Sequence, residues 1–158
     1  MKTVLKIVML SIVLSLIIIF INIIGKNTIK ENISYASSVS ASESQLMARA
    51  INGEARGEPY EGQVAVGAVI LNRVNNPQFP NTITAVIYQA GAFTAVDDGQ
   101  IDVPIAEGST VYQAAQDALN GWDPTGGAIY YFNPATATNQ WIWSRPLIKT
   151  IGKHRFCG

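Results

Sequence analysis

The sequence has few of the residues that many hydrolases use for catalysis. It contains one Cys, Cys157, and one His, His154. Zinc-dependent amidases and peptidases need three protein ligands, mostly His, so these two residues are too few for such a site. They also lie three positions apart in an expected strand, which places them on opposite faces and disfavours a thiol enzyme. One Cys also excludes an internal disulfide.

Other absences narrow the function further. The formal net charge is zero, which argues against nucleic acid as a partner. There is no phosphate-binding Gly-rich loop and no nucleophile elbow around any Ser. We therefore expect neither a metal nor another cofactor. If the protein is an enzyme, catalysis by Asp or Glu carboxyl groups is the type of chemistry that these absences leave.

The N-terminus carries the longest apolar run of the chain. Lys2 and Lys6 precede a run from Ile7 to Ile24. A basic start before such a run is typical of an export signal or a membrane anchor. Ser34-Tyr35-Ala36 offers small residues for cleavage but lies well past Ile24, so both possibilities stay open. Either way we expect the C-terminal part to be exported, at the outer face of the membrane or in the cell wall.

The sequence predicts three segments. Residues 1–24 form the signal or anchor, and residues 25–42, rich in Ser, Asn and Lys, form a linker. Residues 43–158 have mixed composition and are long enough for one domain with one core.

The first part of this domain shows helical patterns. Ser42 and Gln45 form a capping box, which predicts a helix from there to about Ala55. Pro59 starts a second helix, Tyr60–Asn75, whose apolar residues surround the wheel and predict a buried central helix. Two further helices are expected, a short one capped by Asn81 and one running from Ser109 to Asn120-Gly121.

The last part is extended in character. Its short aromatic and β-branched segments predict strands at Ile129–Phe132, Trp141–Trp143 and Ile148–Phe156. The expected fold is therefore α+β, with helices followed by a small irregular β region. Alternation places Trp141 and Trp143 on one face, which is either core or cleft.

Glu54 is a carboxylate on an apolar helix face. Around the helix axis, each residue advances by about 100°, so with Leu46 at zero Glu54 lies at about 80°, between Ala50 and Met47. Arg49 lies on the opposite side. Burial disfavours a charged carboxylate and raises its pKa. A Glu that stays protonated near neutral pH suits a general acid for glycoside cleavage. Small residues on both sides would let a bulky ligand reach it.

Each acidic residue also has an interpretation that involves no catalysis. Glu54 could lie at a frayed helix end or pair with an Arg. Glu58 and Glu61 lie at the start of the second helix, where acidic side chains interact favourably with the helix dipole and stabilise the helix. Asp97 and Asp98 could supply a second carboxylate or form a solvated turn before Gly99.

Several motifs resemble those of the bacterial spore cortex-lytic enzymes, the SleB-type cell-wall hydrolase family. The resemblance covers roughly Glu43 to Cys157. The matching segments are Ala50–Glu58, Gly62–Val66, Leu71–Val74, Gly91–Phe93, Asp117–Gly121, Tyr131–Pro134, Trp143–Arg145 and Gly152–His154.

The resemblance implies a lysozyme-like, lytic-transglycosylase-like fold and cleavage of spore cortex peptidoglycan during germination. It implies that Glu54 is the catalytic acid. Such an enzyme cuts between N-acetylmuramic acid and N-acetylglucosamine, with Glu54 as acid and then base, and leaves a 1,6-anhydro product. By analogy, the substrate-binding residues would be Phe93, Thr94, Tyr131 and Asn133, and we expect Trp143 to join them.

The expected partners are peptidoglycan glycan strands, and the resemblance adds a membrane-associated accessory protein. A monomer is expected. No glycan-binding domain is visible before Glu43, so targeting would depend on the membrane segment or a partner. Two alternatives stay open. One is a hydrolytic muramidase or glucosaminidase in which Asp97 or Asp98 positions water. The other is a non-catalytic module that binds cortex glycan.

Overall fold

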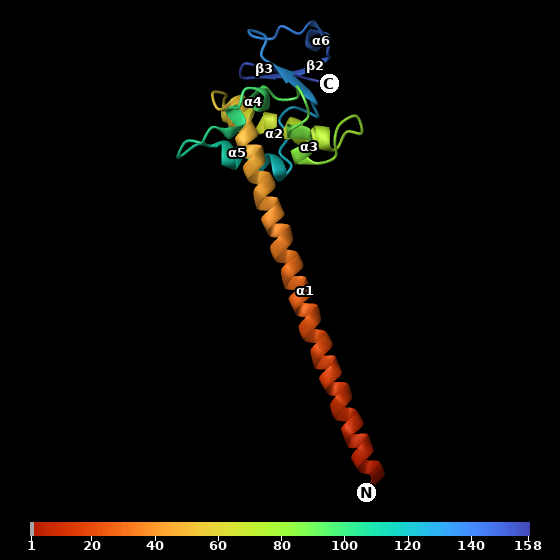
Figure 1. Ribbon diagram of the computed structural model, residues 1–158. Helices are drawn as coiled ribbons and strands as arrows, with labels where there is room; N and C mark the ends of the chain where they lie inside the picture. Colours follow the sequence, from red (N-terminus) through yellow and green to blue (C-terminus); the bar gives the residue numbers. More distant parts are fainter. Residues whose placement is uncertain (1) are drawn as a thin grey trace. The chain divides into compact units, whose positions relative to one another are not determined.

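The computed structural model describes the backbone of residues 2–158 and the side chains of residues 16–34, 37–38 and 40–158 (Figure 1). The chain divides into two compact units, Met1–Ser40 and Ala41–Gly158. The expected signal or anchor and the possible cleavage site fall partly outside the described side chains. Within the part of the chain that is described, no helix has both the length and the apolar character needed to cross a bilayer.

The first helix begins earlier than expected. Helix α1 (Lys2–Ala55) is continuous through Ser42, so the predicted helix start there is wrong, whereas its end at Ala55 is confirmed. Residues 25–42, expected as a linker, are helical. The first proline is Pro59, and a helix propagates easily once formed. Polar side chains bond to the preceding turn without breaking the helix, as Asn22 Nδ2 does to the Ile18 carbonyl at 2.9 Å.

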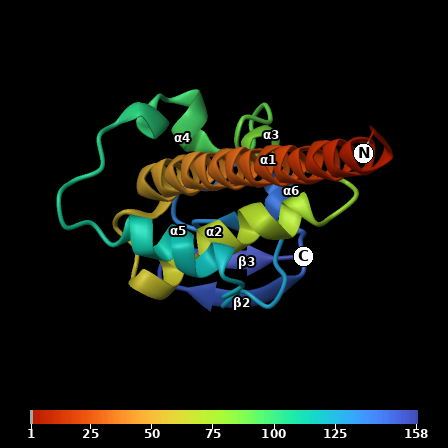
Figure 2. The same cartoon turned by 90° about the horizontal axis from the view of Figure 1, so that it is seen from below.

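Helix α2 (Tyr60–Val74) is the buried central helix that the sequence predicts. It packs against α5 (Val111–Leu119), α3 (Ile83–Ile87) and the sheet, and Figure 2 shows α2 and α5 side by side. Gly67 allows close packing here. A Cβ at this position would lie 2.9 Å from that of Ala118 and 3.2 Å from Ile51 Cδ1. The helices α1, α2 and α5 therefore meet around a residue without a side chain.

The shorter helical turns differ from expectation in their caps. Thr82, and not Asn81, caps α3, because its Oγ1 accepts a hydrogen bond from Ala85 N at 3.1 Å. Thr110 precedes α5, and Ser109 Oγ accepts from Val111 N at 3.4 Å. The expected Gly at the end of α5 is confirmed, since Gly121 has a φ of 97°. The segment between α3 and α5 forms α4 (Thr94–Asp97) and a 3₁₀ turn, η1 (Gln100–Asp102).

The C-terminal part forms a three-stranded antiparallel sheet. Its strands are β1 (Tyr130–Phe132), β2 (Leu147–Ile151) and β3 (His154–Cys157), in the order β1-β3-β2. The expected strand Ile148–Phe156 is a hairpin, because Gly152 turns the chain with a φ of 56°. Helices followed by a small sheet confirm the expected α+β arrangement.

The expected strand Trp141–Trp143 is wrong. These residues form a single helical turn, α6 (Gln140–Trp143). Asn139 favours the turn, because its Oδ1 accepts a hydrogen bond from Trp141 N at 2.9 Å. The two Trp side chains are therefore not on one face, as strand alternation would require.

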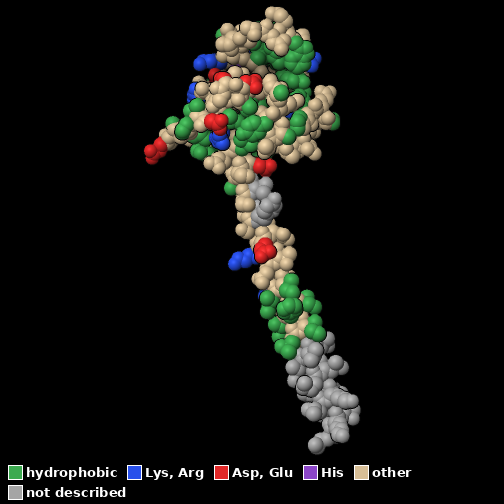
Figure 3. Space-filling view, in the orientation of Figure 1, with side chains coloured by type: hydrophobic (Ala, Val, Ile, Leu, Met, Phe, Trp, Pro, Cys, Tyr) green, Lys and Arg blue, Asp and Glu red, His purple; other side chains and the backbone are tan. Residues whose placement is uncertain are grey.

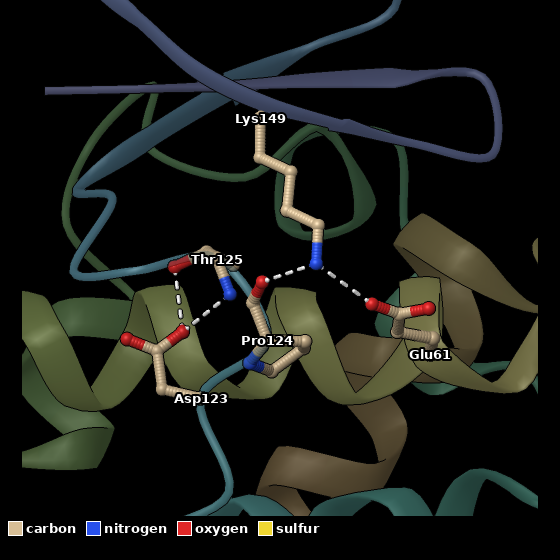
Figure 4. Close-up of polar contacts among 5 residues, drawn as sticks. All are labelled: Glu61, Asp123, Pro124, Thr125 and Lys149. Atoms are coloured by element: carbon tan, nitrogen blue, oxygen red, sulfur yellow. Dashed lines mark hydrogen bonds and ion pairs between the residues drawn. The ribbon is translucent and has the colours of Figure 1, made fainter.

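Polar contacts tie the sheet to the helices (Figure 4). Lys149 Nζ, on β2, donates to Glu61 Oε1 of α2 at 3.0 Å and to the Pro124 carbonyl at 3.1 Å. At the hairpin turn, Lys153 N donates to Glu58 Oε2 at 2.8 Å. Glu58 and Glu61 thus act in packing the sheet on the start of α2.

Candidate active site

Glu54 lies in the last turn of α1 and is held by both of its oxygens. Ala95 N, from α4, donates to Oε1 at 2.7 Å, and Tyr131 OH, from β1, donates to Oε2 at 2.9 Å. The side chain is half-buried. It is therefore not a frayed helix end, and among the described residues no ion pair joins it to an Arg; Arg49, on the opposite side, pairs with Asp102. The two bonds leave acceptor sites on the carboxyl group for a proton or a ligand.

Gly53, one of the small residues expected to give a ligand access to Glu54, has a different role in the structure. A Cβ on Gly53 would overlap that of Ala95 and lie 3.4 Å from Gln100 Cβ. The missing side chain therefore lets α4 approach α1, which brings the Ala95 amide to Glu54. It does not open a path for a ligand. Gly57, by contrast, has no neighbour within 4 Å of such a Cβ.

Tyr131 is a buried hydrogen-bond donor to Glu54. Its ring packs against Phe93, His154 and Phe156, with centroid distances of 6.5, 5.2 and 5.8 Å. Burial, followed by the charge and hydrogen bond of Glu54, raises the pKa of its hydroxyl well above the usual value. The Tyr131 hydroxyl therefore fixes the orientation of the Glu54 carboxyl group.

Glu54 and Tyr131 open onto a cleft of about 540 Å³. Its walls come from α2, the loop before α4, β1, and the segment from Asn133 to α6. The lining residues are Glu54, Arg73, Phe79, Gln89, Ala90, Gly91, Ala92, Thr94, Tyr130, Tyr131, Phe132, Asn133, Thr136, Ala137, Thr138, Asn139, Trp141, Ile142 and His154. Within this lining Glu54 is the one carboxylate. Asp97 and Asp98 are not part of it.

The residues expected to bind substrate occupy different places. Thr94, Tyr131 and Asn133 line the cleft with Glu54. Phe93 is buried beneath it, against Tyr131. Trp143 is not part of the lining and packs edge-on against Phe132, with 4.9 Å between ring centroids.

Sequence reasoning missed Arg73, a buried cation in the cleft. Only 6% of its surface is exposed, and its Nε donates to the Ile129 carbonyl at 2.8 Å. Its guanidinium carbon lies 5.1 Å from the ring centroid of Phe93 and 5.3 Å from that of Phe79. Burial lowers its pKa, while the nearby charge of Glu54 acts in the opposite direction. An Arg on a helix that is apolar all round was the available signal.

His154 is the second residue that was missed. It is buried beside Tyr131 and lines the cleft. Burial lowers its pKa, against the opposing charges of Glu58 and Glu54, so the ring is neutral at pH 7. Among the described residues, no group of three or more His, Cys, Asp or Glu could hold a metal ion. The chemistry of this cleft therefore centres on one carboxyl group with a tyrosine, an arginine and a neutral histidine around it.

The comparisons with known proteins define the class. The family model described as Cell Wall Hydrolase matches residues 57–157. The chain therefore belongs to the cell wall hydrolase family, which confirms the resemblance of its motifs at that level.

Particular relatives are also similar. The chain is 63% identical over 118 residues to the spore cortex-lytic enzyme of Bacillus cereus, covering 75% of this chain and 45% of that enzyme. It is 33% identical over 127 residues to the cell wall hydrolase CwlJ of Bacillus subtilis, covering 70% of this chain and 81% of that protein. The chain thus spans less than half the length of the Bacillus cereus relative.

A solved structure has the same arrangement. The catalytic domain of the germination-specific lytic transglycosylase SleB from Bacillus anthracis matches with a TM-score of 0.69 and 62% identity, over 73% of this chain and 93% of that one. The helix-rich fold with its small antiparallel sheet is therefore that of this catalytic domain.

Proposed function

We propose that this protein cleaves the glycan strands of peptidoglycan as a lytic transglycosylase, with Glu54 as the catalytic acid and base. The observation that carries this proposal is the single carboxylate of the cleft, held by the Ala95 amide and the Tyr131 hydroxyl. The similarity to spore cortex-lytic enzymes supports spore cortex as the substrate. We also propose that the fold is lysozyme-like.

The mechanism needs one residue in two roles. Protonated Glu54 donates its proton to the oxygen between N-acetylmuramic acid and N-acetylglucosamine, and that bond breaks as positive charge develops at C1. The carboxylate of Glu54 then removes the proton from the muramic C6 hydroxyl, whose oxygen bonds to C1. The products are a 1,6-anhydromuramic end and a free N-acetylglucosamine end, and no water is consumed. Glu54 is again protonated.

The composition of the cleft favours this route over hydrolysis. A hydrolase of the usual kind needs two carboxylates, one of which acts as base or nucleophile. Asp97 and Asp98, the residues that could have taken this role, do not line the cleft. Transglycosylation requires only the carboxyl group that is present.

The biological setting completes the proposal. The substrate lies outside the cell membrane, so the enzyme would be exported and act at the outer face of the membrane, in the wall or in the cortex region. It would act as a monomer, and a membrane-associated accessory protein would assist in targeting it.

Mass spectrometry of muropeptides tests the proposal. Spore cortex is treated with the full chain, with Glu54→Gln, and with Glu61→Gln, which alters an acid outside the cleft. We expect anhydro-muropeptides from the full chain and from Glu61→Gln. Loss of the acid should lower their rate of formation by about 10²- to 10⁴-fold in Glu54→Gln.

Other products would contradict the proposal in distinct ways. Reducing-end sugars would establish a hydrolase. Products that persist with Glu54→Gln would remove Glu54 from its role. Binding to cortex without any product from the full chain would favour a glycan-binding module.

A further inference from the structure

Trp141 is an exposed aromatic residue on the wall of the cleft. It lies in α6 and lines the same cleft as Glu54, and 48% of its surface is exposed. Figure 3 shows hydrophobic side chains at the surface of the end of the domain that carries α6 and the sheet. About half of the indole surface therefore stays in contact with solvent on the cleft wall, where a ligand could cover it and gain from its burial.

The ring of Trp141 is already held in place. Tyr130 packs edge-on against it, with 5.1 Å between centroids and 90° between planes. The guanidinium carbon of Arg145 lies 5.0 Å from the centre of the Trp141 ring. Binding a ligand to an immobilised ring costs little side-chain entropy. The fold therefore presents a preorganised aromatic surface.

Polar groups suited to sugar hydroxyls surround this surface. Asn133 and Asn139, in the same lining, use their Oδ1 atoms to accept hydrogen bonds from Ala135 N and Trp141 N, both at 2.9 Å. Among the described residues, neither Nδ2 group has a hydrogen bond. Each asparagine can therefore donate to a ligand that lies over Trp141.

We propose that Trp141 is the stacking platform of a pyranose-binding subsite, in which one sugar ring lies over the indole while Asn133 and Asn139 donate to its oxygens. This inference rests on the proposed function, because it names a subsite for the same glycan strand. A pyranose has an apolar face of C–H groups and a polar rim of oxygens. An aromatic face edged by amide donors complements both.

Trp143 provides a matched contrast within the same helical turn. It is exposed to a similar degree, 41%, and is also held by rings and a cation: Phe132 at 4.9 Å and the Arg155 guanidinium at 5.5 Å. It does not line the cleft. A subsite in the cleft therefore requires Trp141 and not Trp143.

Binding by a full chain that carries Glu54→Gln, and so does not turn over, tests the subsite. The probe is a peptide-free tetrasaccharide of alternating N-acetylglucosamine and N-acetylmuramic acid, titrated by calorimetry. Aromatic residues are enriched among the side chains that carry most of the binding energy, so Trp141→Ala should raise Kd by about tenfold or more, which corresponds to about 1.4 kcal/mol. Trp143→Ala should change it by less than about twofold. Trp141→Phe, which keeps a ring and guards against a folding defect, should retain most of the affinity.

Every outcome decides the inference. Equal losses with Trp141→Ala and Trp143→Ala, or no loss with Trp141→Ala, would overturn the subsite. If the wild type forms anhydro-muropeptides in the parallel assay, the proposed function survives that failure. If the Glu54→Gln parent does not bind the tetrasaccharide, the subsite is overturned, and if the wild type also forms no product, both proposals fail together.

Discussion

The helices and the sheet hold Glu54 in different ways. The helical region supplies a backbone amide, Ala95 N, whereas the sheet supplies a side-chain hydroxyl, Tyr131 OH. Substitutions other than Pro leave this backbone N–H in place, and its position depends on how closely α4 packs on α1. The hydroxyl depends on a single oxygen atom. The helical side of the site should therefore be sensitive to added side-chain volume between α1 and α4. The sheet side should be sensitive to removal of the Tyr131 hydroxyl group.

Gly53→Ala tests the helical side and should have the larger effect. The added Cβ overlaps that of Ala95, so α4 must move away from α1. Overpacking of this kind costs about 1–3 kcal/mol of unfolding free energy. Displacement of a catalytic group by about 1 Å lowers the rate by about a hundredfold. Chemical denaturation and the rate of muropeptide release measure the two effects.

Two variants make this result specific. Gly57→Ala, four positions along the chain, adds the same methyl group in open space and should leave activity within about twofold. Ala95→Gly combined with Gly53→Ala removes the overlapping methyl group and should restore part of the lost activity. An equal loss in Gly53→Ala and Gly57→Ala would show that packing between α1 and α4 does not position Glu54.

Tyr131→Phe tests the sheet side with a smaller change. It removes one hydroxyl and keeps the ring, so the unfolding free energy should change by about 0.5–1.5 kcal/mol. Loss of one orienting bond of that strength should lower kcat by about tenfold and leave KM unchanged. Steady-state kinetics on soluble glycan measures both constants.

The neighbouring tyrosine is the control for this prediction. Tyr130 lines the cleft but has no hydrogen bond to Glu54 among the described residues. Tyr130→Phe should therefore leave kcat within about twofold. A fall in kcat of the same size in both variants would mean that the Tyr131 hydroxyl does not act through Glu54.

The helical side was also the more predictable from sequence. A period of 3.6 residues places Glu54 among Met47, Ala50 and Ile51, and the structure buries those three residues as expected. The central helix Tyr60–Val74 followed from the same periodicity. The local hydrophobic pattern is sufficient to predict which residues are buried where a regular helix packs one apolar face against the core.

The sheet side depends on contacts that no local pattern records. Trp141–Trp143 has strand-like composition, yet the Asn139 side chain favours a helical turn. Tyr131 meets Glu54 across 77 positions of the chain. The role of Gly53 is visible only once Ala95 lies against it. Pairings between distant segments are set by packing, which is why the donors to Glu54 could not be predicted.

His154 gives the smallest predicted effect, on stability and not on rate. Burial lowers its pKa below the ordinary value of 6.5 in the folded state. Between that folded-state pKa and about pH 6.5 the unfolded chain binds more protons, so the unfolding free energy falls as the pH falls through this range and is unaffected above it. His154 also lines the cleft, and solvent screening there should keep the change below about 1 kcal/mol.

His154→Phe should remove this dependence, because a phenyl ring does not titrate and suits a site beside Tyr131 and Phe156. Denaturation at several pH values from about 5 to 7.5 measures it through fluorescence, since all three Trp lie in the unit Ala41–Gly158. The wild type should lose stability toward pH 5, and the variant should lose less. If the unfolding free energy changes with pH equally in the two proteins, then the titration of His154 does not contribute to this dependence.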